Sequence, residues 1–231
     1  MEPARRARAF CVMPTTLVLV PTDQERRLVA PALAVGGPAD PVIELCGFGP
    51  VAAAARTAAL LAARKPDRVL LVGIAGRLDD GLRLGGAYRF DRVACHGVGA
   101  GSGSAFVPAA RLGWPQWPGD PADSATAVVD VIDLPPAFES GPPANGLLLT
   151  VCAASANADD VAARRTLFSA AAAEDMEGFG VALACRLAGV PLAIVRGISN
   201  AAGDRDHTRW QVSEAAAAAG TLAARLLEAS R

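Results

Sequence analysis

The first third of the chain alternates short apolar runs with segments of helical composition, and this alternation limits the fold more than any other feature of the sequence. The runs span residues 15–20, 42–45 and 69–72, and the helical segments between them span 25–34 and 53–63. Continuous apolar runs of this length are typical of strands buried on both faces, and strands separated by helices pair in parallel. The sequence therefore predicts an α/β fold around a mostly parallel sheet.

A loop-rich middle separates this region from a second stretch of regular structure. Residues 97–146 are rich in Gly, Pro, Ser and Asp, and only 127–131 has the composition of a strand there. We expect long excursions from one end of the sheet, because too little chain lies on either side for two separate domains. Residues 14–231 are thus predicted to form a single domain. Its later elements are predicted, as strand, helix, helix, strand and helix, at residues 147–151, 159–172, 179–187, 191–195 and 213–227.

The N-terminal residues superficially suggest a secretion signal, because three arginines precede an apolar stretch. Pro14 interrupts that stretch, and the polar segment 24–27 stands where a cleavage site should lie. We interpret residues 1–13 as a disordered extension before the domain. No apolar run in the sequence approaches the length of a membrane span, so we expect no membrane partner.

Composition and charge argue against several classes of function. The formal net charge of −1 gives no electrostatic reason to expect a nucleic-acid partner. Lys65 is the only lysine, which rules out a P-loop and argues against Schiff-base chemistry. Five cysteines without C-x-x-C spacing, together with two histidines, argue against a metal site or a disulfide framework. We expect reduced cysteines and a cytoplasmic location.

A glycine motif lies between the second predicted strand and the helix that follows it. Residues 47–52 match G-x-G-x-x-A, the pattern of a dinucleotide-binding turn. Such a site needs an acidic residue at the end of the next strand to hold the ribose. That strand ends in the small residues 73–76, which offer none. We therefore interpret the motif as a tight strand-to-helix turn.

Polar side chains follow predicted strands or begin predicted helices at three points. Glu25 follows the first strand, Glu177 lies in an acidic turn before an apolar helix, and Asn200 ends a strand. Each has a plainer explanation: the two glutamates favour helix N-termini, and the asparagine favours an Asx turn. Alternatively, all three lie at the rim of the sheet, where α/β proteins bind small ligands. A carboxylate buried beside an apolar helix would then need a partner or a ligand.

Taken together, these segments resemble the nucleoside phosphorylase and nucleosidase superfamily over most of residues 15–228. The likeness is carried by residues 20–25, 47–53, 73–76, 176–177 and 198–200. It implies a three-layer α/β/α sandwich around a mixed, mostly parallel sheet, assembled as dimers or larger homo-oligomers. It also implies a small-molecule nucleoside substrate whose purine N-glycosidic bond is cleaved without metal or cofactor.

The resemblance also implies roles for individual residues. Glu25 would orient and deprotonate an attacking water, Glu177 would hold the ribose hydroxyls, and Asn200 would bind the purine. The remaining residues expected to contact substrate are Gly73, Ile74, Ala75, Met176, Phe179 and Trp210.

The amide at position 200 departs from one branch of the superfamily. Nucleosidases for methylthioadenosine and adenosylhomocysteine carry an Asp there, which protonates N7 and accepts from the 6-amino group of adenine. An Asn is no acid near neutral pH, but it can donate to N7 or to a 6-oxo oxygen. This favours a 6-oxopurine such as hypoxanthine, and the C-terminal third is most similar to the futalosine hydrolases of menaquinone biosynthesis. The proton donor to the base stays open between water and Asp204.

The predicted strand at residues 69–72 bears on the choice between water and phosphate as nucleophile. Phosphorolytic members typically place an Arg on that strand, which is wholly apolar here, and Arg77 comes after it. The negative charge of Glu25 would also oppose phosphate, so we expect hydrolysis. The alternatives are a methylthioadenosine/adenosylhomocysteine-type nucleosidase, a purine nucleoside phosphorylase, and a nucleoside-binding module without catalytic activity.

Overall fold

A computed structural model describes residues 14–34, 41–123, 126–138 and 146–229. Within these residues, nine strands form one mixed sheet. Its strands are β1 (Thr16–Val20), β2 (Val42–Leu45), β3 (Arg68–Arg77), β4 (Ala87–Phe90), β5 (Arg92–His96), β8 (Val131–Asp133), β9 (Leu147–Val151), β10 (Ala171–Asp175) and β11 (Leu192–Ala201). Two short strands, β6 (Gly99–Ala100) and β7 (Val107–Pro108), pair with each other outside it.

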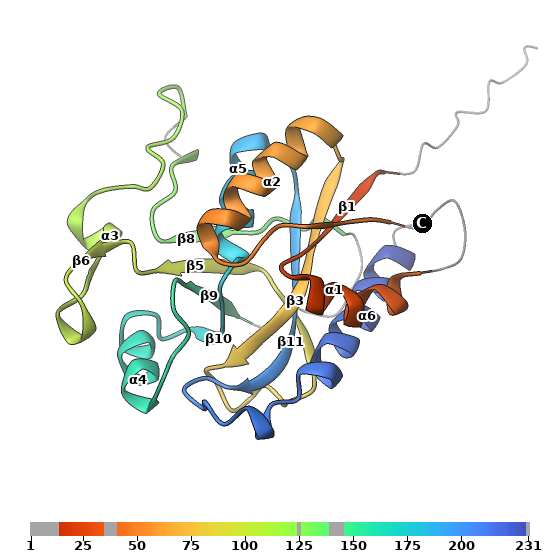
Figure 1. Ribbon diagram of the computed structural model, residues 1–231. Coiled ribbons are helices and arrows are strands. Elements are labelled where there is room, and N and C mark those ends of the chain that lie inside the picture. The colour runs from red at the N-terminus through yellow and green to blue at the C-terminus, as the bar shows by residue number, and fades with distance from the viewer. Residues whose placement is uncertain (1–13, 35–40, 124–125, 139–145, 230–231) are drawn as a thin grey trace, which may run out of the picture.

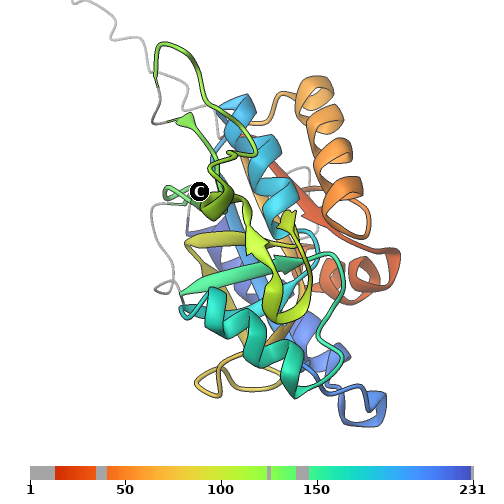
Figure 2. The same cartoon turned by 90° about the vertical axis from the view of Figure 1, so that its left-hand side faces the viewer.

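The α-helices are α1 (Asp23–Leu33), α2 (Pro50–Arg64), α3 (Ala109–Leu112), α4 (Ala158–Leu167), α5 (Gly178–Ala188) and α6 (Val212–Glu228). Figures 1 and 2 show α2 and α5 side by side over one face of the sheet. Helices α1 and α6 pack together on the other face, and α4 covers the same face beneath β9.

Strand β3 lies at the centre of the sheet and pairs with three others. It runs parallel to β1 over its first half, parallel to β11 along its whole length, and antiparallel to β10 at its end. Alternate side chains of β3 enter two separate apolar cores: Val69 and Leu71 face α2 and α5, whereas Leu70 and Val72 face α1 and α6. Burial on both faces explains the continuous apolar run, and the predicted fold class is confirmed.

Two predicted boundaries were wrong for the same reason. Residues 73–76 are not a turn after a four-residue strand, because β3 continues to Arg77 and stays paired with β11. Strand β11 likewise extends beyond the predicted strand at residues 191–195 to Ala201, so Asn200 lies near a strand end, as expected. Backbone pairing with a neighbouring strand continues past the apolar side chains, so the composition of one segment does not reveal where the strand ends.

Other differences between the predicted and the observed elements lie in the middle of the chain and directly after it. The helix predicted at 159–172 ends at Leu167, and the alanines that follow form β10 against β9. The strand predicted at 127–131 is found at Val131–Asp133, and Val128 makes only an isolated bridge with Trp117. Strands β4 and β5 were not predicted from the sequence. The extension predicted at residues 1–13 lies outside the described residues.

Candidate active site

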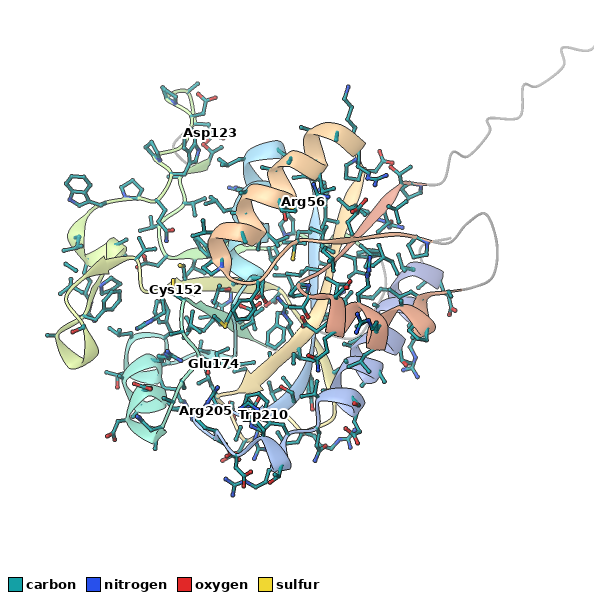
Figure 3. All side chains as sticks on the ribbon, viewed as in Figure 1. Arg56, Asp123, Cys152, Glu174, Arg205 and Trp210 are labelled. Carbon is teal, nitrogen blue, oxygen red and sulfur yellow. The ribbon has the colours of Figure 1, made fainter. Side chains whose placement is uncertain are left out.

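A cavity of about 470 Å³ opens where the carboxyl ends of β1, β3 and β11 meet. This edge of a parallel sheet is the usual ligand-binding position in α/β proteins. In Figure 3, Glu174, Arg205 and Trp210 lie together near the ends of β3 and β11. The lining includes seven of the ten residues predicted to act in the site, namely Glu25, Ile74, Ala75, Met176, Glu177, Asn200 and Trp210.

Glu25 is held in place by contacts to both carboxylate oxygens. It occupies the first turn of α1, whose N-cap Thr22 accepts a hydrogen bond from the Glu25 backbone N–H at 3.2 Å. The Thr22 hydroxyl donates to Oε2 at 2.7 Å, and the Ile74 backbone N–H donates to Oε1 at 3.0 Å. The side chain is buried but borders the cavity. A buried carboxylate with lone pairs left toward a cavity is suited to accept a proton.

Arg196 is the largest residue in the wholly buried core and was not predicted as part of the site. Its Nε and Nη2 atoms donate to Oδ2 of Asp175 at 3.0 and 2.5 Å, and Nη2 lies 3.4 Å from Oε2 of Glu177. Its Nη1 atom has no hydrogen-bond partner within the described residues. A buried guanidinium N–H without a partner is costly. Arg196 is wholly buried and does not line the cavity, so this atom lies behind the cavity wall.

Gly73 makes room for this guanidinium, which explains why a glycine stands inside β3. A Cβ atom added at Gly73 would collide with Nη1 of Arg196 and lie 2.7 Å from Oε1 of Glu25. The carboxylate of Glu25 and Nη1 of Arg196 therefore both lie against Gly73. Gly73 does not line the cavity itself; it allows two polar groups to converge there.

Glu177 lies between the guanidinium and the start of α2. Its Oε1 accepts from the backbone N–H of Gly49 at 3.1 Å, so the glycine motif at residues 47–52 positions a carboxylate of the site. Burial raises the pKa of Glu177 to about 7, against the opposing charge of Arg196. Asp175 and Glu25 act in the same direction as burial, because three carboxylates surround one guanidinium.

Asn200 lies at the end of β11 beside Ala75 and Gly76 of β3. Its Oδ1 accepts from the Ser199 hydroxyl at 2.8 Å, and its Nδ2 donates to the Ala201 carbonyl at 2.8 Å. The same hydroxyl lies 3.2 Å from the Ala75 carbonyl oxygen, which competes with Asn200 for its single proton. An amide nitrogen has two N–H donors, so Nδ2 retains one for a group in the cavity.

A second polar cluster in the cavity wall was also missed by sequence reasoning. Glu174 accepts from the Ser155 backbone N–H at 2.8 Å and from its hydroxyl at 2.7 Å. Arg164 of α4 donates to Glu174 at 2.5 Å and to the Ala153 carbonyl at 2.6 Å. This cluster ties the turn after β9 to β10 and α4. Its members lie on three successive elements, 9 to 19 residues apart in sequence, so no single short motif marks it.

Besides Gly73, two predicted residues lie outside the cavity lining. Phe179 is buried in the core on the α5 side, and its backbone N–H donates to Thr150. Asp204 accepts from the backbone N–H of Asp206 and from Arg209. These contacts lower the pKa of Asp204, the Asp206 hydrogen bond most, so it is ionised at neutral pH. The structure does not bring Asp204 to a position where it would protonate a ligand in the cavity.

In the described part of the chain, no group of three or more His, Cys, Asp or Glu side chains is arranged to hold a metal ion. None of the helices described is both long and apolar enough to cross a membrane.

The fold and the cavity define a class: α/β/α proteins with buried carboxylates and an amide converging at the strand ends of a mixed sheet. The chain belongs to the Phosphorylase superfamily, whose family model matches residues 30–230. This assignment agrees with the resemblance carried by the sequence motifs.

Two relatives and one crystal structure are similar to this chain. Futalosine hydrolase from Streptomyces coelicolor is 33% identical over 183 residues, covering 74% of this chain and 72% of the relative. The 5′-methylthioadenosine/S-adenosylhomocysteine nucleosidase of Colwellia psychrerythraea is 32% identical over 196 residues, covering 77% and 74%. A crystal structure of such a nucleosidase from Colwellia psychrerythraea, in complex with adenine, superposes with a TM-score of 0.74 at 21% identity, covering 94% and 96%.

Proposed function

We propose that this protein hydrolyses the N-glycosidic bond of futalosine, releasing hypoxanthine and dehypoxanthine futalosine in menaquinone biosynthesis. The observation that carries the proposal is that Glu25, Glu177 and Asn200 line one cavity, with the buried guanidinium of Arg196 behind the two carboxylates. These groups provide a proton acceptor, a hydroxyl acceptor, a base-binding amide and a cation that holds the carboxylates in place. The likeness to futalosine hydrolase supports the choice of substrate.

Water is the nucleophile in this account. It lies in the cavity beside Glu25, donates a hydrogen bond to that carboxylate, and gives up its proton to it as the water oxygen attacks C1′. Phosphate is disfavoured there. The guanidinium is surrounded by the carboxylates of Glu25, Asp175 and Glu177, which leave no net positive charge to bind an anion.

The ribose lies against Glu177 and Met176, both in the cavity wall. The two oxygens of the Glu177 carboxylate accept from the vicinal hydroxyls. As the bond to the base breaks, the sugar acquires oxocarbenium character, and a nearby carboxylate stabilises that positive charge. Holding the hydroxyls also fixes C1′ relative to the attacking water.

Asn200 selects the base by donating a hydrogen bond. Its free Nδ2–H points to N7 or to a 6-oxo oxygen, both of which are acceptors on hypoxanthine. This donation stabilises the departing base as negative charge develops on it. Because Asp204 lies outside the cavity lining, we assign protonation of the leaving base to water.

The test compares futalosine with its 6-amino analogue, which differs only at a group to which Asn200 is proposed to donate a hydrogen bond. The wild type should release the base from futalosine with the higher kcat/KM, by about tenfold or more, since one hydrogen bond is worth roughly this factor. Asn200→Asp should reverse or abolish the preference. Equal turnover of both compounds by the wild type would refute the assignment of base specificity.

The principal alternative within the family is a methylthioadenosine/adenosylhomocysteine-type nucleosidase, because relatives of that kind match at similar identity. Base release from methylthioadenosine but not from futalosine would favour it. Binding of either nucleoside by calorimetry without any base release would favour a non-catalytic module.

Two further properties belong to the proposal. We infer a homo-oligomer, dimer or larger, as in the superfamily, and light scattering after size-exclusion chromatography tests this. We also infer a cytoplasmic location, which is supported by free thiols at Cys46, Cys95, Cys152 and Cys185.

A further inference from the structure

The loop between β11 and α6 presents a cation at the exposed rim of the cavity. Arg205 and His207 are exposed, and both line the cavity together with Trp210. The guanidinium carbon of Arg205 lies 5.2 Å from the centroid of the Trp210 ring, and Figure 3 shows the two residues next to each other. His207 stacks on the same ring at 4.2 Å. The Trp210 indole N–H donates to the Asp204 carbonyl, so the ring is fixed to its own loop.

The acidic residues of this loop are already paired with other groups. Arg209 contacts Asp204 at 2.7 Å and Asp206 at 3.4 Å, and Thr208 donates to Asp206 as well. Arg205 forms no ion pair with any residue that the structure describes, although two carboxylates lie beside it in sequence. Its charge is therefore available to a ligand at the mouth of the cavity.

The charges of the cavity differ between its interior and its rim. Glu25, Glu174, Asp175 and Glu177 are all buried in the interior wall. An anionic group on a ligand is repelled by that wall and attracted to Arg205. A nucleoside with an anionic substituent would thus enter with its neutral sugar and base innermost.

The position of the ribose identifies which substituent reaches the rim. In the proposed function, on which this step rests, Glu177 takes the 2′ and 3′ hydroxyls and Asn200 takes the base. The ribose substituent that is left to reach the rim is therefore the one at the 5′ carbon. Phe48 lines the cavity with 65% of its surface exposed, and with Trp210 it supplies apolar surface at the opening.

We infer that Arg205 is a specificity-determining residue that binds a carboxylate carried on the 5′ side of the nucleoside. Phe48 and Trp210 contact the apolar part of that substituent. The carboxyphenyl ketone of futalosine has both features, an aromatic ring and a carboxylate. A guanidinium binds a carboxylate through two parallel N–H donors, which a lysine ammonium does not reproduce.

The test compares futalosine with its carboxylate methyl ester in the wild type and in Arg205→Ala. The wild type should favour the acid over the ester in kcat/KM by about 10- to 100-fold, the range expected for a hydrogen bond to a charged group. In Arg205→Ala this ratio should fall to near one, and Arg205→Lys should recover only part of it. Arg205→Gln provides a second uncharged variant, and thermal melts verify that each variant folds.

Arg209→Ala is the matched control, because it removes the same charge from the same loop at a residue that does not line the cavity. It should keep the ratio within about threefold of the wild type, which would exclude a general effect of net charge. A wild-type enzyme that hydrolyses acid and ester equally well, or an Arg205→Ala ratio like that of the wild type, would overturn the role of Arg205. Failure of the wild type to hydrolyse either compound would instead refute the proposed function.

Discussion

Replacing Arg196 by Met removes the cation from the buried cluster while keeping a side chain of comparable length. Arg196 is wholly buried and contacts Asp175 at 2.5 and 3.0 Å and Glu177 at 3.4 Å. Without it, Asp175 keeps its hydrogen bonds from Thr150 and Gly178 but loses its counter-charge. Three buried carboxylates would then face one another with no cation between them.

The expected decrease in the free energy of unfolding follows from the cost of leaving a buried charge unpaired. Removing one partner of a buried ion pair costs about 3–5 kcal/mol, out of the roughly 5–15 kcal/mol that stabilise a typical domain. The loss should depend on pH. Burial raises the pKa of Glu177 to about 7 even with Arg196 present, and removing that cation raises it further. The folded variant would retain a proton on Glu177 that the unfolded chain releases, so its stability falls as pH rises above the unfolded pKa of this group. The deficit relative to the wild type should therefore be larger at pH 8 than at pH 5.5.

Urea denaturation followed by tryptophan fluorescence, at both pH values, measures this free energy of unfolding. Arg209→Met is the matched control, because Arg209 pairs with Asp204 and Asp206 at the surface, and its midpoint should match the wild type. A loss below about 1 kcal/mol for Arg196→Met at pH 8, or the same loss at both pH values, would refute the reasoning about the buried cluster.

Three further substitutions test the remaining parts of the site. Glu25→Gln should lower kcat by about 10²- to 10⁴-fold with little change in KM. Turnover close to that of the wild type would refute the role of Glu25 as general base. Burial raises the pKa of Glu177 to about 7, so kcat/KM should decline as pH falls below that value and its carboxylate gains a proton. Glu177→Gln should lose this inflection in a pH–rate profile, and a flat wild-type profile would contradict the assignment. Gly73→Ala should lower kcat and, through overpacking, the free energy of unfolding by about 1–3 kcal/mol. Gly76→Ala in the same strand should destabilise less, because its Cβ would meet its neighbours at 3.5 Å, and equal unfolding midpoints for the two variants would contradict this.

The elements that could be predicted are those with a complete local signal. The central strand β3 could be predicted because both of its faces are buried and residues 69–72 are wholly apolar. Strand β10 could not be found, because Ala171–Ala173 has helical composition and becomes a strand only by pairing with β9 and β3. The same applies to the far end of β11, where pairing with β3 continues through polar residues.

The site residues that could be predicted are those that lie next to a strand end. Glu25, Glu177 and Asn200 were placed together because the topology of a parallel sheet collects such positions at one edge. Arg196 was overlooked although a lone charge in a buried strand signals a paired group. Asp204 lies outside the cavity lining because its own loop satisfies the carboxylate, a contact that depends on the path of the chain between residues 204 and 209.

The central claim is that this protein uses water to release hypoxanthine from futalosine. Chromatography of the products, with and without added phosphate, tests it most directly, with inosine and methylthioadenosine as comparison substrates. The account predicts hypoxanthine and dehypoxanthine futalosine at a rate that does not change with phosphate concentration. A rate that requires phosphate, or base release from methylthioadenosine and none from futalosine, would contradict it.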